Sequence, residues 1–158
     1  MAILQKLKEH FSRDSVTLDL QDIQALILRS RPEPYVGVHA MLHFDEAAGA
    51  RNLLGRLAPH IASADNWSED LDFWIGAALS FEGLKALGVP DAQLKTFPLP
   101  FQQGMAARAE QLRDFGPNAP ENWEDVFKPG NCHLALTIYA VDAVSYTHLR
   151  AHETREDL

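Results

Sequence analysis

The pattern that most constrains the fold is a strict alternation of apolar residues that begins after a proline turn. Pro32 and Pro34 form this turn, and neither residue allows a helix to continue through it. From Tyr35 to Phe44 every second residue is apolar, namely Val36, Val38, Ala40, Leu42 and Phe44. Successive side chains of a strand point to opposite faces, so this segment is predicted to be a strand with one buried face.

Two later segments also predict strands. Residues 71–79 are apolar and rich in large side chains. Residues 132–140 alternate as the first strand does, with apolar residues at Cys132, Leu134, Leu136, Ile138 and Ala140. A short apolar run at residues 26–28, before the proline turn, predicts one further brief strand.

Helical periodicity is found between the predicted strands. Residues 45–61 carry apolar side chains at helical spacing, and Asp45 is placed to cap this helix. Ser80 is predicted to cap a short helix over residues 81–87, which Gly88 ends.

A further amphipathic helix is predicted over residues 98–114. Its large apolar residues, Phe101, Met105 and Leu112, are expected to pack on the sheet. The segment that follows is rich in turn-forming residues, and Trp123 is expected to anchor it.

The order of these elements predicts an α+β fold. Strand, helix, strand, helical insertion and strand match the first part of a ferredoxin-like β-α-β-β-α-β unit. One helix and one strand of that unit are missing, so we predict an incomplete ferredoxin-like domain with an unpaired sheet edge. We assign residues 16–143 to this domain and residues 1–15 to a helical amino-terminal extension.

The last fifteen residues have no apolar face and continue none of these patterns. Residues 144–154, VSYTHLRAHET, resemble one translated frame of a transposase sequencing adapter over eleven consecutive positions. We therefore predict that residues 144–158 are a non-native tail from adapter read-through. This interpretation removes His148, His152 and Glu153, whose helical spacing would otherwise suggest a metal site.

Charge and composition exclude several classes of partner. The chain of 158 residues has 14 Lys+Arg against 22 Asp+Glu, for a formal net charge of -8. Nucleic acids and anionic membranes attract clustered Lys and Arg, so neither is predicted as a partner. The amino terminus lacks the pattern of an export signal, and no run approaches the roughly 18 apolar residues of a membrane span. With Cys132 as the single cysteine, the sequence predicts a cytoplasmic protein without a disulfide framework.

The positions of the histidines and of the cysteine in the sequence indicate structural roles for these residues. His39 and His43 share one face of the first strand but lie about 13 Å apart, too far to share a metal ion. Cys132 and His133 are adjacent, so a strand points them to opposite faces, and Cys132 is expected to be a small core residue. His60 is placed at a helix end, where the carbonyl dipole favours it.

The acidic residues and the short sequence motifs do not indicate a catalytic or binding site. Glu69 with Asp70 and Glu124 with Asp125 lie in polar segments and are expected to be ordinary surface groups. The sequence contains no dinucleotide-binding glycine motif, Walker loop or zinc-protease motif. No catalytic, cofactor-binding or metal-binding residue is therefore assigned.

Four stretches taken together resemble a known family. They are LQDIQALIL (20–28), AALSFEGLKALGVP (77–90), FQQGMAARAEQLRDFGPNAPENW (101–123) and HLALTIYA (133–140). In this order and spacing they resemble the amino-terminal half of a dye-decolourising (Dyp-type) peroxidase, a haem enzyme of the dimeric α+β barrel superfamily. The resemblance covers roughly residues 18–143, and its most specific part is the third stretch.

The resemblance implies two ferredoxin-like domains with haem b between them. Such an enzyme reduces hydrogen peroxide while it oxidises aromatic small molecules, using a proximal histidine and the aspartate of a distal G-x-x-D-G motif. The chain has no Asp-Gly dipeptide, so the distal motif is absent, and His133, His60 and Arg108 are not assigned to the family's roles. We expect an inactive fragment of a parent haem peroxidase, for which the resemblance allows a homo-oligomer.

An alternative is a non-catalytic domain of the same superfamily that binds a small molecule or dimerises. The downstream sequence discriminates the two. A G-F-x-D-G-type motif and a later histidine followed by an arginine would indicate the peroxidase.

Overall fold

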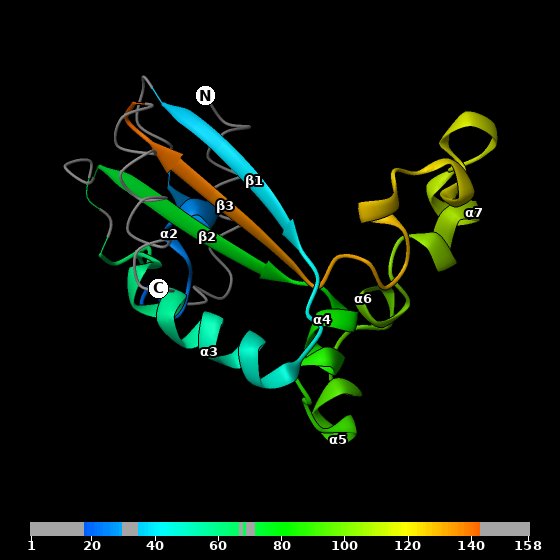
Figure 1. Ribbon diagram of the computed structural model, residues 1–158, viewed down its shortest axis with the longest axis horizontal. Coiled ribbons are helices and arrows are strands. Elements are labelled where there is room, and N and C mark those ends of the chain that lie inside the picture. Colours follow the sequence, from blue (N-terminus) through cyan, green and yellow to red (C-terminus); the bar gives the residue numbers. More distant parts are fainter. Residues whose placement is uncertain (1–17, 30–34, 67, 69–71, 143–158) are drawn as a thin grey trace, which may run out of the picture.

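The computed structural model describes residues 18–29, 35–66, 68 and 72–142. Three strands in these ranges form one antiparallel sheet of order β1-β3-β2, namely β1 (Val36–Leu42), β2 (Phe73–Leu79) and β3 (Leu134–Ala140). The last strand lies in the centre and pairs with both others (Figure 1). The three long strands and the α+β fold are thus confirmed, and the strand order is that of a ferredoxin-like unit.

One face of the sheet is covered by α3 (Ala47–Leu57), which runs along the strands in Figure 1. Leu57 packs against Leu136, and Ala50 packs against the fully buried Leu134. Leu134 and Leu136 belong to the apolar face that the alternation predicted. The hydrophobic core therefore lies between this helix and the sheet.

The helix caps agree with the predictions in part. Ser80 caps α4 (Phe81–Ala86), because its Oγ accepts a hydrogen bond from the Gly83 N–H at 2.9 Å. The expected capping role of Asp45 is wrong. The N-cap residue of α3 is Glu46, whose side chain makes no capping hydrogen bond, and Asp45 lies one residue before the cap.

Residues 26–28 form part of a helix, so the short strand predicted there is wrong. Helix α2 spans Ala25–Leu28 and lies beside β2. Just before it, the Gln24 side chain occupies the outer edge of β2. Its Nε2 donates to the Ala77 carbonyl at 2.8 Å, and the Ala77 N–H donates to its Oε1 at 2.9 Å. Because a side chain takes this place at the edge, the following apolar run is free to form a helical turn.

The helix predicted over residues 98–114 is broken. The structure has α6 (Leu99–Gln103), a 3₁₀ helix at Ala106–Arg108 and α7 (Ala109–Leu112). Between the first two lies Gly104 with a φ of 70°, a left-handed conformation that glycine adopts readily and that ends a helix.

The packing expected for this segment is also wrong. Phe101, Met105 and Leu112 are 37%, 62% and 40% exposed, and they do not pack on the sheet. Figure 1 shows why: the segment lies beyond the end of the strands, away from either face. Residues 81–132, which we call the arm, connect β2 to β3; Ala86 and Leu87 near the start of the arm pack on the core, and its later part projects beyond the strands.

The remaining elements of the described chain are short. They are α5 (Asp91–Leu94) and the 3₁₀ helices Ala58–His60, Gly116–Asn118, Pro120–Asn122 and Asp125–Phe127. Trp123 anchors the turn-rich part of the arm as expected, since its Nε1 donates to the Asn118 carbonyl at 2.9 Å. Within the described ranges, no helix is both long and apolar enough to cross a bilayer.

Candidate functional site

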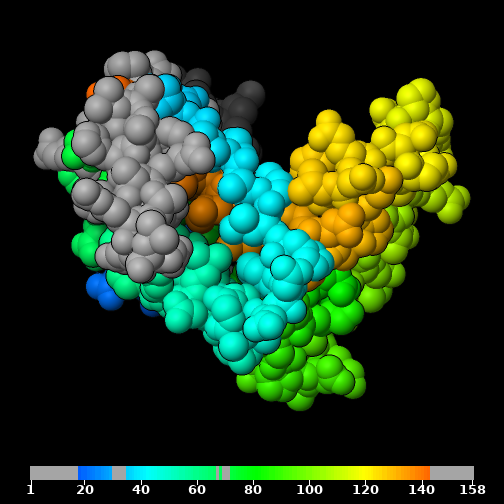
Figure 2. Space-filling view, in the orientation of Figure 1, coloured from blue at the N-terminus to red at the C-terminus, as the bar shows by residue number. Residues whose placement is uncertain are grey.

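An open cavity of about 790 Å³ lies within the arm. It is lined by residues 80–82, by residues 100–108 and by several residues between 123 and 132. Its large apolar lining residues are Phe81, Phe101, Met105, Trp123 and Phe127. The space-filling view shows the arm standing beside the end of β1, with an indentation between them (Figure 2).

The two ends of the arm are joined at one point of the sheet. The Ser80 N–H donates to the His133 carbonyl at 3.0 Å, and the Ser80 Oγ donates to the Cys132 carbonyl at 2.7 Å. Gly83 lies against the same stretch, because a β-carbon there would lie 2.9 Å from the His133 carbonyl carbon. The cavity is therefore positioned by contacts between the first turn of α4 and the residues just before β3.

Aromatic contacts shape the inner wall of the cavity. The ring of Phe101 meets that of Phe81 edge-on, with 5.9 Å between centroids, and that of Phe97 at 5.3 Å. Phe127 and Met105, which also line the cavity, remain 52% and 62% exposed. Large apolar side chains that stay this exposed are typical of a surface that contacts another molecule or another part of a protein.

Two of the charged residues that line the cavity, Lys128 and Glu82, form ion pairs within the arm. Lys128 lies 2.7 Å from Asp125, and this hydrogen bond together with the lysine's charge lowers the pKa of the Asp125 carboxyl. Glu82 lies 2.9 Å from Lys85. Asp125 is an exposed surface group, as the sequence predicted. The cavity thus combines large apolar side chains with charged ones, which also include Arg108 and Glu124.

Behind the cavity lies His133, which is 7% exposed. Its Nδ1 accepts a hydrogen bond from the Phe44 N–H at 2.9 Å. Its ring stacks on that of His43 with 4.1 Å between centroids. Because Nδ1 accepts, the proton of the neutral ring lies on Nε2, and the added proton of the cationic form would oppose the Phe44 N–H.

Burial lowers the pKa of His133 below its usual value of 6.5, and the nearby charge of His43 lowers it further. Glu82, Asp45 and a hydrogen bond with the Gly130 backbone act in the opposite direction without reversing the shift. The folded protein therefore favours the neutral imidazole.

The stability of the fold is expected to fall in acid because of His133. The unfolded chain binds a proton at the usual pKa of histidine, about 6.5, whereas the folded chain binds it only at lower pH. The contribution of the neutral His133 to the free energy of unfolding is thus fully present above pH 6.5 and is lost as the pH falls below that value. Urea unfolding of the native chain and of a His133→Gln variant between pH 5 and 8 measures this, and we expect the variant to lose less stability in acid. Identical pH dependence in both proteins would contradict the assignment.

The structure does not bring the other predicted candidates together. His39 lies in β1 with its Nδ1 2.9 Å from the Thr137 Oγ1, whereas His43 lies just past the end of that strand. Both are exposed, as expected of partly solvated histidines. His60 ends the 3₁₀ helix that follows α3, as the sequence indicated.

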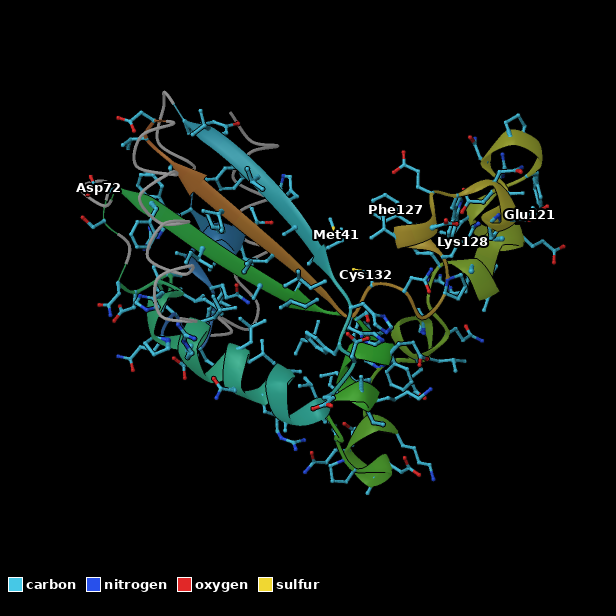
Figure 3. All side chains as sticks on the ribbon, in the orientation of Figure 1. Met41, Asp72, Glu121, Phe127, Lys128 and Cys132 are labelled. Carbon is cyan, nitrogen blue, oxygen red and sulfur yellow. The ribbon has the colours of Figure 1, made fainter. Side chains whose placement is uncertain are left out.

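The expectation that Cys132 is a core residue is wrong. It is half-buried and lines the cavity, and its Sγ lies 3.8 Å from the Met41 Sδ. Figure 3 shows the two sulfur-containing residues where the sheet meets the arm, and Phe127 on the arm itself. The strand begins at Leu134, so Cys132 lies before the alternating face that was expected to bury it.

The remaining candidates lie outside the described residues, so the structure does not place them. They are His148, His152, Glu153, Glu69 and Asp70. Sequence analysis missed the cavity and the contact of His133 with His43 and Phe44. A glycine inside the predicted helix, Gly104, was the available signal that the helix would break and open the arm.

The solved structures that resemble this chain belong to one class of protein. No protein-family model matches the chain, and no curated protein does. Among solved structures, an ancestral D-type dye decolorizing peroxidase matches with a TM-score of 0.69 and 26% identity, over 87% of this chain and 31% of that chain. A decolorizing peroxidase from Auricularia auricula-judae matches with a TM-score of 0.67 and 22% identity, over 85% of this chain and 29% of that chain.

The chain therefore shares its ferredoxin-like α+β fold with dye-decolorizing peroxidases. It spans less than a third of the length of either of these solved structures. The similarity supports a relationship to this peroxidase family.

Proposed function

We propose that the chain is the amino-terminal part of a haem-dependent peroxidase of the dye-decolourising type. The observation that carries the proposal is the fold match at a TM-score of 0.69, over 87% of this chain but 31% of the peroxidase. The four sequence stretches that resemble the same family support it independently. The parent enzyme would reduce hydrogen peroxide and oxidise aromatic small molecules, and a homo-oligomeric parent is compatible with the proposal.

We also propose a division of the chain, which rests on the sequence patterns. Residues 16–143 would be the first part of the ferredoxin-like domain, residues 1–15 an amino-terminal extension, and residues 144–158 a tail from adapter read-through. The sheet supports an incomplete domain, since no described residue pairs with the outer edge of β1. The acidic composition, with a net charge of -8, supports the proposal that nucleic acids and membranes are not partners, and the single cysteine, Cys132, supports a cytoplasmic location.

The described residues do not fit a haem site by themselves. No histidine among them lines the cavity, and the described residues hold no cluster of three or more potential metal ligands. His133 has its Nδ1 engaged by the Phe44 N–H and is buried behind the cavity wall. We therefore derive no catalytic step for this chain and propose that the parent protein supplies the haem ligands from other residues.

The proposal predicts that the 158-residue chain alone is inactive. Mixed with haemin, it should give neither the shifted Soret band of ligated haem nor oxidation of a dye by hydrogen peroxide, because no described histidine lines the cavity and the buried His133 has its Nδ1 engaged by the Phe44 N–H. Free haemin under the same conditions is the control. Turnover clearly above that of free haemin would contradict the inactive-fragment proposal.

The parent enzyme is tested separately by its downstream coding sequence. We expect a G-F-x-D-G-type motif and a later histidine followed by an arginine. If both were absent, the peroxidase assignment would fail and the non-catalytic alternative would be favoured. At present no structural observation favours that alternative, because both reported neighbours are peroxidases.

A further inference from the structure

His133 connects the ends of two strands to the point where the arm returns to the sheet. Its N–H donates to the Leu42 carbonyl at 2.8 Å, and its carbonyl accepts from the Ser80 N–H at 3.0 Å. Its Nδ1 accepts from the Phe44 N–H at 2.9 Å. Leu42 ends β1, Ser80 follows β2, and His133 precedes β3. We call these four residues the joint.

Close neighbours hold the imidazole of His133 in place. The ring of His43 stacks on it with 4.1 Å between centroids, and the ring of Phe44 lies at 5.4 Å. On the backbone side, a β-carbon on Gly83 would lie 3.1 Å from the Cα of His133. The imidazole is also 93% buried as part of a residue that is 7% exposed. It therefore reaches water only if the backbone of His133 moves as well.

The two stacked histidines respond differently to protonation. The Nδ1 of His43 lies 3.2 Å from the Asn131 carbonyl, which can only accept a hydrogen bond. His43 therefore carries a proton on Nδ1, and a second proton on Nε2 leaves this bond in place. In His133 the Nδ1 is itself the acceptor, so the added proton would point at the Phe44 N–H. A cationic His133 must give up its bond to Phe44.

Charged groups face His133 from the segments around it. Burial lowers the pKa of its imidazole, and the charge of His43, just after β1, lowers it further. Glu82 in α4 and Asp45 before α3 act in the opposite direction. Glu82 also lies 2.9 Å from the ammonium of Lys85, which competes for its charge. The two carboxylates therefore do not stabilise a cationic His133 enough to offset its burial.

We propose that the joint is a pH-sensitive switch: when His133 binds a proton, its hydrogen bonds with Phe44 and Ser80 open together while the sheet remains formed. The first bond opens because Nδ1 no longer accepts. The second opens because the ring reaches water only when the backbone of His133 moves. Gly130 and Cys132, on the same stretch, line the cavity, so acid releases one of its walls.

The switch goes beyond the peroxidase assignment and does not depend on it. It concerns contacts among described residues, whereas the assignment concerns the parent enzyme and its haem. The haemin test reports nothing on the joint, so the two proposals can fail separately.

Amide hydrogen exchange of the 158-residue chain, resolved by residue with NMR, tests the switch. The protection factor compares the exchange rate of an amide with its rate in an unstructured peptide at the same pH. For the Phe44 and Ser80 amides it should fall by up to about tenfold per pH unit below pH 6.5, because the open joint binds a proton that the closed joint does not.

Low concentrations of urea distinguish opening of the joint from unfolding of the whole domain. Opening of the joint exposes little surface, so exchange at Phe44 and Ser80 should hardly depend on urea. Ile138, in the middle of the central strand, is the internal control. Its amide should exchange more slowly and should accelerate steeply with urea, because it requires global unfolding.

Two variants assign the pH dependence to His133. His133→Gln keeps an oxygen that can accept from the Phe44 N–H but binds no proton, so protection at the joint should stay constant between pH 7 and pH 5. His43→Gln keeps a donor for the Asn131 carbonyl and removes the opposing charge, so the fall should be smaller than in the native chain. An equal fall in the native chain and in His133→Gln would overturn the proposal. So would joint amides with the urea dependence of Ile138 in the native chain, a result that does not require either variant to fold.

Discussion

Gly83→Ala is expected to lower the free energy of unfolding by about 3 kcal/mol, at the upper end of what overpacking costs. A β-carbon on this residue would overlap the carbonyl oxygen of His133 and lie 2.9 Å from its carbonyl carbon. Both atoms belong to the backbone just before β3, so no side-chain rotation relieves the overlap. The strain would separate α4 from the sheet at the point where the arm is attached.

A second helical glycine supplies the control for this prediction. Gly49 lies in α3 with nothing within 4 Å of the position of an added β-carbon. Gly49→Ala should stabilise the protein by up to about 1 kcal/mol, because alanine has the higher helix propensity. Urea unfolding of both variants measures the difference. If the two substitutions shifted stability in the same direction, the close approach at Gly83 would be wrong.

Leu134→Ala is expected to cost about 2–5 kcal/mol of unfolding free energy. The side chain is 0% exposed and lies in the core between the central strand and α3. Removing it leaves a cavity that its neighbours in both elements can fill only in part.

An exposed leucine is the matched control for the core substitution. Leu112, in the arm, is 40% exposed, so Leu112→Ala should change stability by less than about 1 kcal/mol. Thermal or urea unfolding of the two variants measures the difference. Comparable losses in the two variants would show that the arm, contrary to the structure, packs as tightly as the core.

The strands could be predicted from the sequence because their pattern is local and repeats many times. The alternation from Val36 to Phe44 leaves one register that places these apolar side chains on one face of the sheet, and the same holds for the strand that begins at Leu134. The serine cap of α4 could be predicted for the same reason. The Ser80 Oγ accepts a hydrogen bond from the N–H of Gly83, which is only three residues later in the chain.

The arm could not be predicted because periodicity does not say what a helix packs against. Phe101, Met105 and Leu112 have the spacing of a core-facing helix, yet Phe101 and Met105 line an open cavity and Leu112 is exposed. Gly104 breaks the expected helix. The segment lies beyond the end of the strands, so it does not pack on the sheet. The same limit applies to Cys132, whose place at the cavity depends on where β3 begins.

The sequence by itself determined the strand-forming segments, the α+β class and the resemblance to dye-decolourising peroxidases, because these follow from residue types and their order along the chain. Only the tertiary structure decided which strand is central, which edge Gln24 occupies, and how Phe44 and His43 meet His133. Those contacts join residues far apart in the chain, and their energies depend on burial and orientation that exist only after the sheet has formed.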